Sequence, residues 1–207
     1  MVHAVRIRHR GSTCSGVLVS PTLRPGVAAT HFVLTCAHFF ATSTSSTTPP
    51  GTYLVEVPLP GRPLLRIPVA AVRTIDGTDL AVVRLQRPTP PVSLAAFAAP
   101  TWGQRLETCG FGGLATSHHG PATRPGRLWL QLPLAWSRTS TTRVRHALVL
   151  RSCAIKGDSG GPVCAATGAV VGIQSLILDP FGHNLGLATA AAVQPHRRAI
   201  LSALGAL

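Results

Sequence analysis

The chain has 207 residues, 45% of them hydrophobic and 12% charged, which is enough apolar material for one large domain or two small subdomains. Six acidic residues against 19 Lys and Arg give a formal net charge of +13 at pH 7 and exclude an acidic protein. No apolar run approaches the length of a membrane span, and residues 1–10 lack the apolar core of a signal peptide. We therefore expect no membrane span, and either secretion after removal of a leader or an intracellular location.

The positive charge comes almost entirely from arginine, because Lys156 is the only lysine and 18 of the 19 basic residues are Arg. These arginines are spread along the chain, several of them near Pro, as the composition of a GC-rich genome would give. No basic run interleaved with aromatic residues, of the kind that binds single strands, is present. We therefore favour a compositional origin of the charge over a dedicated polyanion site, and nucleic acid is not an expected partner.

The predicted elements are short apolar segments separated by Gly, Pro, Ser and Thr, a pattern typical of many short strands. In the first half of the chain, strands are expected at 14–20, 30–35, 53–57, 64–69 and 80–85. Residues 42–50 are rich in Ser, Thr and Pro and are expected to form a surface loop. Residues 88–100, rich in Pro and Ala, read as the connection between two halves.

In the second half, strands are expected at 106–113, 127–132, 146–150, 161–164, 169–176 and 185–189, with a loop at 117–126. The apolar spacing of residues 194–206 predicts a C-terminal helix. These elements predict an all-β chain that ends in one helix.

Residues 157–162 read Gly-Asp-Ser-Gly-Gly-Pro, in which glycines on both sides of Ser159 allow a tight turn that presents the hydroxyl and nearby amides. A serine hydroxyl is a weak nucleophile unless a base removes its proton and a third group orients that base. The sequence offers a base in His38, which follows an apolar strand in Thr-Cys-Ala-His, and an orienting carboxylate in Asp79, which precedes Leu-Ala-Val-Val. Asp76 is a rival for this role but lacks that apolar continuation.

The order His38, Asp79, Ser159 and the three motifs together resemble the trypsin/chymotrypsin-like family of serine proteases, over roughly residues 12–204. The resemblance implies an all-β fold of two six-stranded antiparallel barrels, at about 1–90 and 101–193, in one peptidase domain with a C-terminal helix at about 194–206. It implies a serine endopeptidase that acts on a polypeptide substrate through an acyl-enzyme, without a cofactor or metal, and we expect a monomer. The N–H groups of Gly157 and Ser159 would form the oxyanion hole.

The resemblance also places the substrate-binding positions. Ser175 corresponds to the family serine that supports the Asp and contacts the substrate backbone, and Lys156 is assigned to the same surface. Cys153 takes the base of the primary pocket, where trypsin-like members that select Arg or Lys carry Asp. Ile177 and Gly186 fall near the two pocket walls. A neutral Cys153 and a bulky Ile177 predict small or medium apolar P1 residues.

The chain departs from the family pattern at its N-terminus and at its cysteines. No Ile-Val-Gly-Gly segment precedes Cys14 to supply an amine for Asp158, so we expect an internal arginine partner and no zymogen cleavage. The candidates are Arg127, Arg138, Arg143 and Arg145. Five cysteines leave at least one thiol unpaired within the chain, and no spacing indicates a zinc site.

The resemblance leaves the disulfide pairing open. Cys36 could pair with Cys14 if the strand geometry permits, Cys109 and Cys164 lie near a family disulfide but shifted from it, and Cys153 is the expected free thiol.

Two alternatives to a general endopeptidase remain at this stage. One is a processing protease that cuts a single partner. The other is a non-catalytic module that kept the fold and uses its basic surface on a polyanion or a protein. The complete set His38, Asp79 and Ser159 argues against the second, because a binding module has no need of all three.

Overall fold

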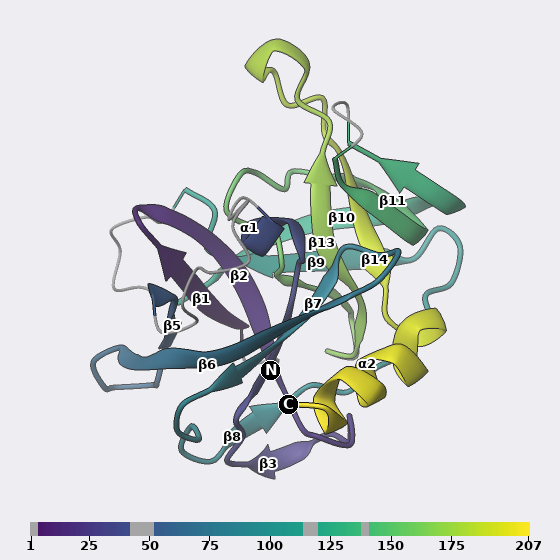
Figure 1. Ribbon diagram of the computed structural model, residues 1–207. Helices are drawn as coiled ribbons and strands as arrows, with labels where there is room; N and C mark the ends of the chain where they lie inside the picture. The colour runs from purple at the N-terminus through teal and green to yellow at the C-terminus, as the bar shows by residue number, and fades with distance from the viewer. Residues whose placement is uncertain (1–3, 42–51, 114–119, 138–140) are drawn as a thin grey trace.

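Two closed antiparallel β-barrels of six strands each make up most of the protein (Figure 1). The computed structural model describes residues 4–41, 52–113, 120–137 and 141–207. This architecture confirms the predicted all-β, chymotrypsin-like fold with a short C-terminal helix. Among the described residues, no helix is long and apolar enough to cross a membrane.

The first barrel closes in the strand order β1-β2-β4-β7-β6-β5. Its strands are β1 (Ala4–His9), β2 (Ser12–Val19), β4 (Phe32–Thr35), β5 (Leu54–Val57), β6 (Leu65–Ile75) and β7 (Leu80–Leu85). Alternate side chains point inward, and β-branched residues such as Val5, Val33 and Val83 fill the interior. β1 was not among the expected strands, although its arginines alternate with apolar residues, and it closes the barrel by pairing with both β2 and β5.

The second barrel closes in the order β10-β11-β14-β13-β12-β9. Its strands are β9 (Arg105–Gly110), β10 (Ala122–Trp136), β11 (Arg143–Ser152), β12 (Pro162–Ala165), β13 (Val170–Ile177) and β14 (Leu187–Ala192). Leucines and small residues fill it, among them Leu106, Leu128 and Leu150. The predicted loop at 117–126 is wrong in its second half, because β10 begins at Ala122 and pairs there with β9.

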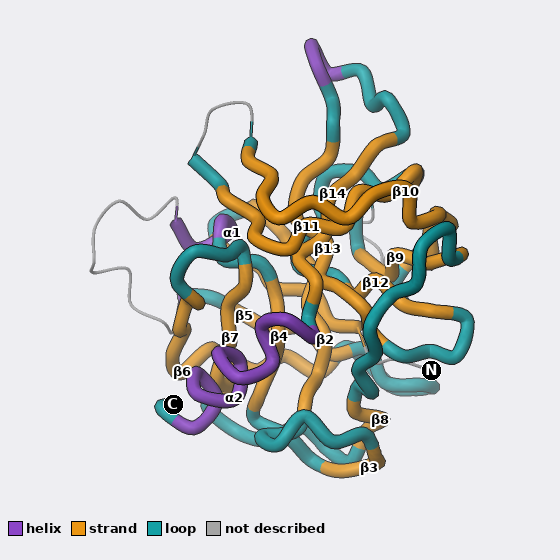
Figure 2. The backbone as a smooth tube through the Cα atoms, turned by 90° about the vertical axis from the view of Figure 1, so that its right-hand side faces the viewer, coloured by secondary structure: helices purple, strands orange, loops and turns teal. Residues whose placement is uncertain are grey.

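A third apolar cluster joins the barrels. The helix α2 (Arg197–Gly205) buries Ile200, Ala203 and Leu204 in a cluster that also contains Leu34 of the first barrel and Ala191 of the second. Figure 2 shows α2 lying across the strands of the first barrel, although it follows the second barrel in sequence. The C-terminal segment therefore helps to fix the two barrels relative to each other.

The remaining elements are short. A two-stranded sheet of β3 (Gly26–Ala28) and β8 (Val92–Leu94) and a single helical turn, α1 (His38–Ala41), belong to the first half of the chain. Two 3-10 turns, η2 (Pro180–Gly182) and η3 (Gln194–His196), lie in the second half. The predicted surface loop at 42–50 lies outside the described residues.

Candidate active site

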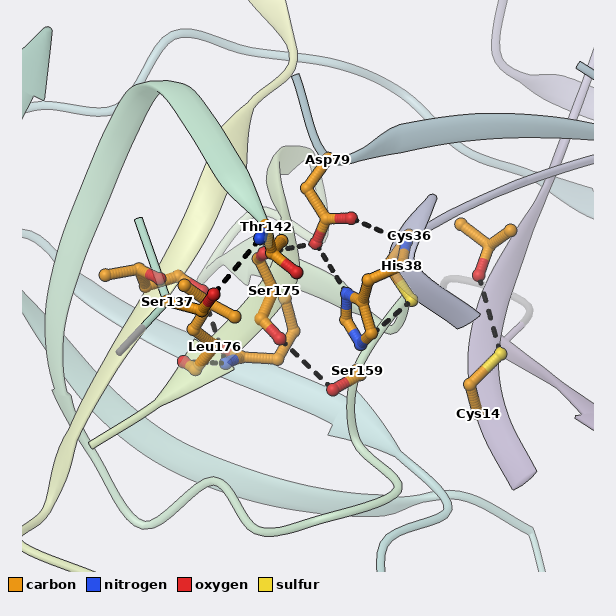
Figure 3. Close-up of polar contacts among 12 residues, drawn as sticks. Cys14, Cys36, His38, Asp79, Ser137, Thr142, Ser159, Ser175 and Leu176 are labelled. Atoms are coloured by element: carbon orange, nitrogen blue, oxygen red, sulfur yellow. Dashed lines mark hydrogen bonds and ion pairs between the residues drawn. The ribbon is translucent and has the colours of Figure 1, made fainter. Parts of the chain in front are cut away.

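His38 and Asp79 are brought together by the pairing of β4 with β7, in which Thr35 faces Ala81. His38 lies just beyond the end of β4, and Asp79 lies just before β7, so both side chains project from the same end of the barrel. Nδ1 of His38 lies 2.7 Å from Oδ2 of Asp79, and the backbone N–H of His38 donates to Oδ1 at 2.8 Å. The carboxylate therefore fixes both the backbone and the ring of the histidine (Figure 3).

Ser175, on β13 of the second barrel, completes the surroundings of this carboxylate. Its hydroxyl donates to Oδ2 of Asp79, and both residues are only 2% exposed. A buried carboxylate is costly unless its oxygens accept hydrogen bonds, and three donors satisfy Asp79. The contact crosses between the barrels, so the position of Asp79 depends on how they pack.

Ser159 lies on a turn whose neighbouring positions, 157 and 160, require glycine. Gly157 and Gly160 have φ of +98° and +81°, and a side chain at Gly160 would collide with the carbonyl oxygen of Ser15. The Ser159 carbonyl accepts from the N–H of Ser15 at 2.7 Å, and the N–H of Gly160 donates to Gln174 at 2.7 Å. Within the described structure, the N–H groups of Gly157 and Ser159 have no hydrogen-bond partner in the protein.

The hydroxyl of Ser159 faces the cleft but does not donate to His38 in this structure. It donates instead to the carbonyl oxygen of Ser175 at 3.1 Å, while Nε2 of His38 lies 3.8 Å from the sulfur of Cys36 (Figure 3). A change of the Ser159 side-chain torsion is the step that would turn this hydroxyl from Ser175 toward the imidazole.

Cys36 is an unusual neighbour for the histidine. Burial lowers the pKa of His38, but the Cys36 sulfur and the Asp79 carboxylate raise it, and the net pKa lies well above the usual value. Burial also raises the pKa of the Cys36 thiol well above its usual range, so this thiol is neutral at pH 7. The charge that favours the imidazolium at that pH is therefore the carboxylate of Asp79.

Asp158, next to Ser159, is fully buried, and the arginine that pairs with it is not one of the four that we predicted. Nε of Arg124 lies 2.5 Å from Oδ2 of Asp158, and the backbone N–H groups of Gly112 and Ile155 also donate to this carboxylate at 2.8 and 2.9 Å. A second nitrogen of Arg124 donates to the carbonyl of Gly112 at 2.8 Å. An internal arginine was expected, but Arg124 was not among the candidates.

The four candidate arginines were wrong because all of them come after Arg124 in the sequence. Arg127 lies on the same strand but faces an outer hollow, and Arg143 and Arg145 are exposed on β11. Arg138 lies outside the described residues. Arg124 was not considered because residues 117–126 were expected to form a loop. Its pairing on β10 places it beside Gly112.

A cleft of about 480 Å³ runs beside Ser159 and His38, with mostly apolar walls. Of the predicted substrate-binding residues, Lys156, Ser175 and Ile177 line it, whereas Cys153 and Gly186 do not. Cys153 is exposed because its neighbours Ser152 and Ala154 are both buried and direct it outward. The sequence analysis missed the other lining residues, which are Trp136, Ser137, Val149, Leu178, Asp179, Pro180, Leu187, Ala188 and Thr189.

All five cysteines are free thiols, so neither possible pairing, Cys14 with Cys36 or Cys109 with Cys164, forms a disulfide in this structure. The sulfur of Cys14 instead lies 3.8 Å from the hydroxyl of Thr35. Among the described residues, no group of three or more His, Cys, Asp and Glu side chains is arranged to hold a metal ion.

Comparison of the sequence with known protein families gives a match. The sequence profile of the trypsin-like peptidase domain matches residues 14–173, a span that contains His38, Asp79 and Ser159. No curated protein matches the chain in sequence.

Several solved protease structures share the fold. The protease domain of MamO from Magnetospirillum magneticum is 23% identical, with a TM-score of 0.68 over 95% of this chain and 94% of that one. The Rv3671c protease from M. tuberculosis in its active form is 18% identical, with a TM-score of 0.69 over 98% of this chain and 81% of that one. The HtrA-type protease AlgW, solved with a tripeptide, is 16% identical, with a TM-score of 0.68 over 98% of this chain and 60% of that one.

Proposed function

The chain belongs to the trypsin-like peptidase domain family, and from that premise we propose that it is a serine endopeptidase that uses His38, Asp79 and Ser159. The observation that carries the proposal is the contact between His38 and Asp79 at 2.7 Å beside the glycine-rich turn of Ser159. Asp79 holds Nδ1 of the imidazole, so that Nε2 is the nitrogen available to the serine.

In the proposed reaction, Oγ of Ser159 attacks the carbonyl carbon of the substrate while Nε2 of His38 takes its proton. The carbonyl oxygen becomes an oxyanion that accepts hydrogen bonds from the N–H groups of Gly157 and Ser159. His38 then gives the proton to the leaving amine, which departs as the C–N bond breaks and an ester on Ser159 forms. Water, activated by His38, hydrolyses that ester and restores the serine.

An extended peptide would align along Ser175–Ile177. The pairing of β12 with β13 stops at Pro162 and Ile173, so this end of β13 has an edge beside the cleft that β12 does not cover. An exposed edge binds an extended peptide through backbone hydrogen bonds. Ser159 already donates to the carbonyl of Ser175, and a substrate that occupied the cleft would compete for the same edge.

The cleft supports a preference for small or medium apolar P1 residues. Val149, Leu187 and Ala188 give it apolar walls, and Ile177 contributes a bulky side chain. Among the described residues that line the cleft, Asp179 is the one carboxylate, and it forms an ion pair with Lys156 at 3.0 Å. The described lining residues thus offer no unpaired carboxylate to select Arg or Lys.

Labelling with a fluorophosphonate tests the proposal, because the reagent forms a covalent bond with an activated serine. We expect one adduct, mapped by peptide mass spectrometry to Ser159, and none in Ser159→Ala or His38→Ala. An adduct elsewhere, or equal labelling of Ser159→Ala, contradicts the assignment.

A library of peptides that vary only at P1 tests the specificity. We expect Ala, Val and Leu to be cleaved with higher kcat/KM than Arg or Lys. Efficient cleavage after Arg would overturn this preference, and its loss in Asp179→Asn would then identify Asp179 as the selecting group.

A further inference from the structure

A row of three arginines crosses the outer surface of the second barrel, away from the cleft. Arg127 of β10 pairs directly with Arg105 of β9 on one side and with Arg151 of β11 on the other. All three side chains are exposed. Like charges directly opposite each other on neighbouring strands destabilise a sheet, so the row has an energetic cost in the free protein.

No carboxylate compensates this row in the part of the chain that the structure describes. None of the three arginines forms an ion pair or a side-chain hydrogen bond there. Four of the six acidic residues of the chain are engaged elsewhere, namely Glu56, Asp79, Asp158 and Asp179. Glu107 lines the same hollow but forms no ion pair with the three arginines, and the four side chains together carry a net charge of +2.

The three arginines surround a hollow of about 600 Å³, whose lining also includes Glu107, Pro125 and Gly126. None of its residues lines the cleft beside Ser159. The guanidinium of Arg151 lies 5.2 Å from the ring centre of Trp129, a cation–π contact that restrains this arginine at one end of the row. The hollow is therefore a second, separate concave surface with a strongly positive lining.

We propose that this hollow binds an anion that carries two or more phosphate or sulfate groups. Across three neighbouring strands, the two outer arginines, Arg105 and Arg151, are about 10 Å apart. This spacing suits several linked oxyanions better than a single one. Each guanidinium can donate two parallel hydrogen bonds to such a group. The bound anion relieves the repulsion along the row and thereby stabilises the folded protein.

The test is calorimetric titration of the purified protein with sodium tripolyphosphate at low salt, in wild type, Arg127→Gln and Arg198→Gln. Arg198 is an exposed arginine on α2 outside the hollow, so its variant loses the same charge. We expect one site in wild type, affinity about ten- to a hundredfold weaker in Arg127→Gln, and a change below about twofold in Arg198→Gln. Tripolyphosphate should raise the Tm of wild type and of Arg198→Gln more than that of Arg127→Gln.

Equal weakening in both variants, or no binding by wild type, would overturn the proposal, since the first outcome reports only the net charge of +13. Arg105→Gln, at the end of the row, provides a second variant that should also weaken binding. Competition distinguishes the sources of the anion. If a short oligothymidylate displaces tripolyphosphate from wild type but not from Arg127→Gln, the site takes phosphates carried by a polymer. Resistance to that competitor indicates a free polyphosphate. Binding is read without turnover, so a failure here does not bear on the proposed protease.

Discussion

Each barrel buries one carboxylate against arginine, but the two carboxylates have different surroundings. In the first barrel, Glu56 is 1% exposed and contacts Arg6 at 2.6 Å, with Arg8 and Arg66 at 3.4 and 3.2 Å. In the second, Asp158 contacts Arg124 at 2.5 Å and two backbone N–H groups. Glu56 joins strands of a barrel wall, whereas Asp158 holds the turn that presents Ser159. The same chemistry should therefore support folding at one place and both folding and activity at the other.

The largest expected effect is that of Asp158→Asn, which keeps the shape of the side chain but removes its charge. Arg124 then lacks its carboxylate, and the turn of Gly157 and Ser159 loses the anchor that orients its N–H groups. We expect kcat/KM to fall by about a hundredfold or more, the scale of losing an oxyanion donor. The measurement is peptide hydrolysis below the Tm of the variant, with circular dichroism to confirm that it is folded. Activity within a few-fold of wild type would show that Asp158 does not position the turn.

Glu56→Gln is the matched change in the first barrel. Breaking a buried ion pair leaves Arg6 without its carboxylate, and we expect a loss of about 3–5 kcal/mol in the free energy of unfolding. We expect kcat/KM of the folded protein to stay near that of wild type, because Glu56 contacts no residue of the cleft. Denaturant unfolding and hydrolysis on the same sample separate the two effects. A loss of activity as large as that of Asp158→Asn would end the distinction between the two sites.

The pH dependence of stability sharpens the same comparison. Burial would raise the pKa of Glu56, but Arg6 and Arg8 lower it below the usual value. A lowered folded pKa contributes stability that is present above the unfolded pKa of about 4.5 and is lost as the pH falls through the folded pKa. We expect this acid loss in wild type and a smaller one in Glu56→Gln, measured by urea unfolding from neutral to acid pH. An unchanged acid loss in the variant would contradict the assignment to Glu56.

The pH dependence of activity should report on His38, whose pKa is raised, rather than on a carboxylate whose pKa is lowered. In the proposed reaction His38 is the general base and must be neutral. Its pKa is raised above the usual 6.5, so we expect activity to be lost as the pH falls through that raised value. We expect the acid limb of kcat/KM to have its midpoint above pH 6.5. A midpoint at or below 6.5 would show that the contacts of His38 in the free enzyme do not raise its pKa.

The smallest expected effect concerns Cys36, which lies within 3.8 Å of Nε2 of His38. Cys36→Ala removes this competing contact, so that Nε2 becomes available to the hydroxyl of Ser159. Because the hydrogen bond to the neutral Cys36 sulfur also raises the pKa of His38, we expect the acid limb to move to lower pH. We expect fluorophosphonate labelling about two- to tenfold faster, the scale of one side-chain torsion preference. Cys153→Ala, at an exposed cysteine that does not line the cleft, is the control that should change neither quantity.

The sequence predicted the parts of this protein that depend on local pattern. Apolar runs such as Leu80–Leu85 predicted strands, and the three motifs identified the family, because glycine turns and strand ends are encoded over a few neighbouring residues. The exposed position of Cys153 and the pairing of Arg124 with Asp158 were not predictable in this way. Both depend on strand register across the second barrel and on the direction of single side chains.

β1 shows the same limit. Its arginines alternate with apolar residues, but nothing local shows that Arg6 is buried: Arg6 is 4% exposed because it is paired with Glu56, 50 residues away. A buried ion pair between distant segments leaves no local signal in the sequence, although it decides which strand closes the barrel.

The most direct test of the central claim is to trap the acyl-enzyme. Wild-type protein mixed with an apolar-P1 peptide ester, quenched in acid and digested, should give a peptide containing Ser159 that carries the acyl group. The ester forms as Oγ replaces the alcohol, and the same peptide from Ser159→Ala should carry no added mass. Turnover in wild type with no adduct on Ser159, or turnover that persists in Ser159→Ala, would contradict a serine mechanism at this site.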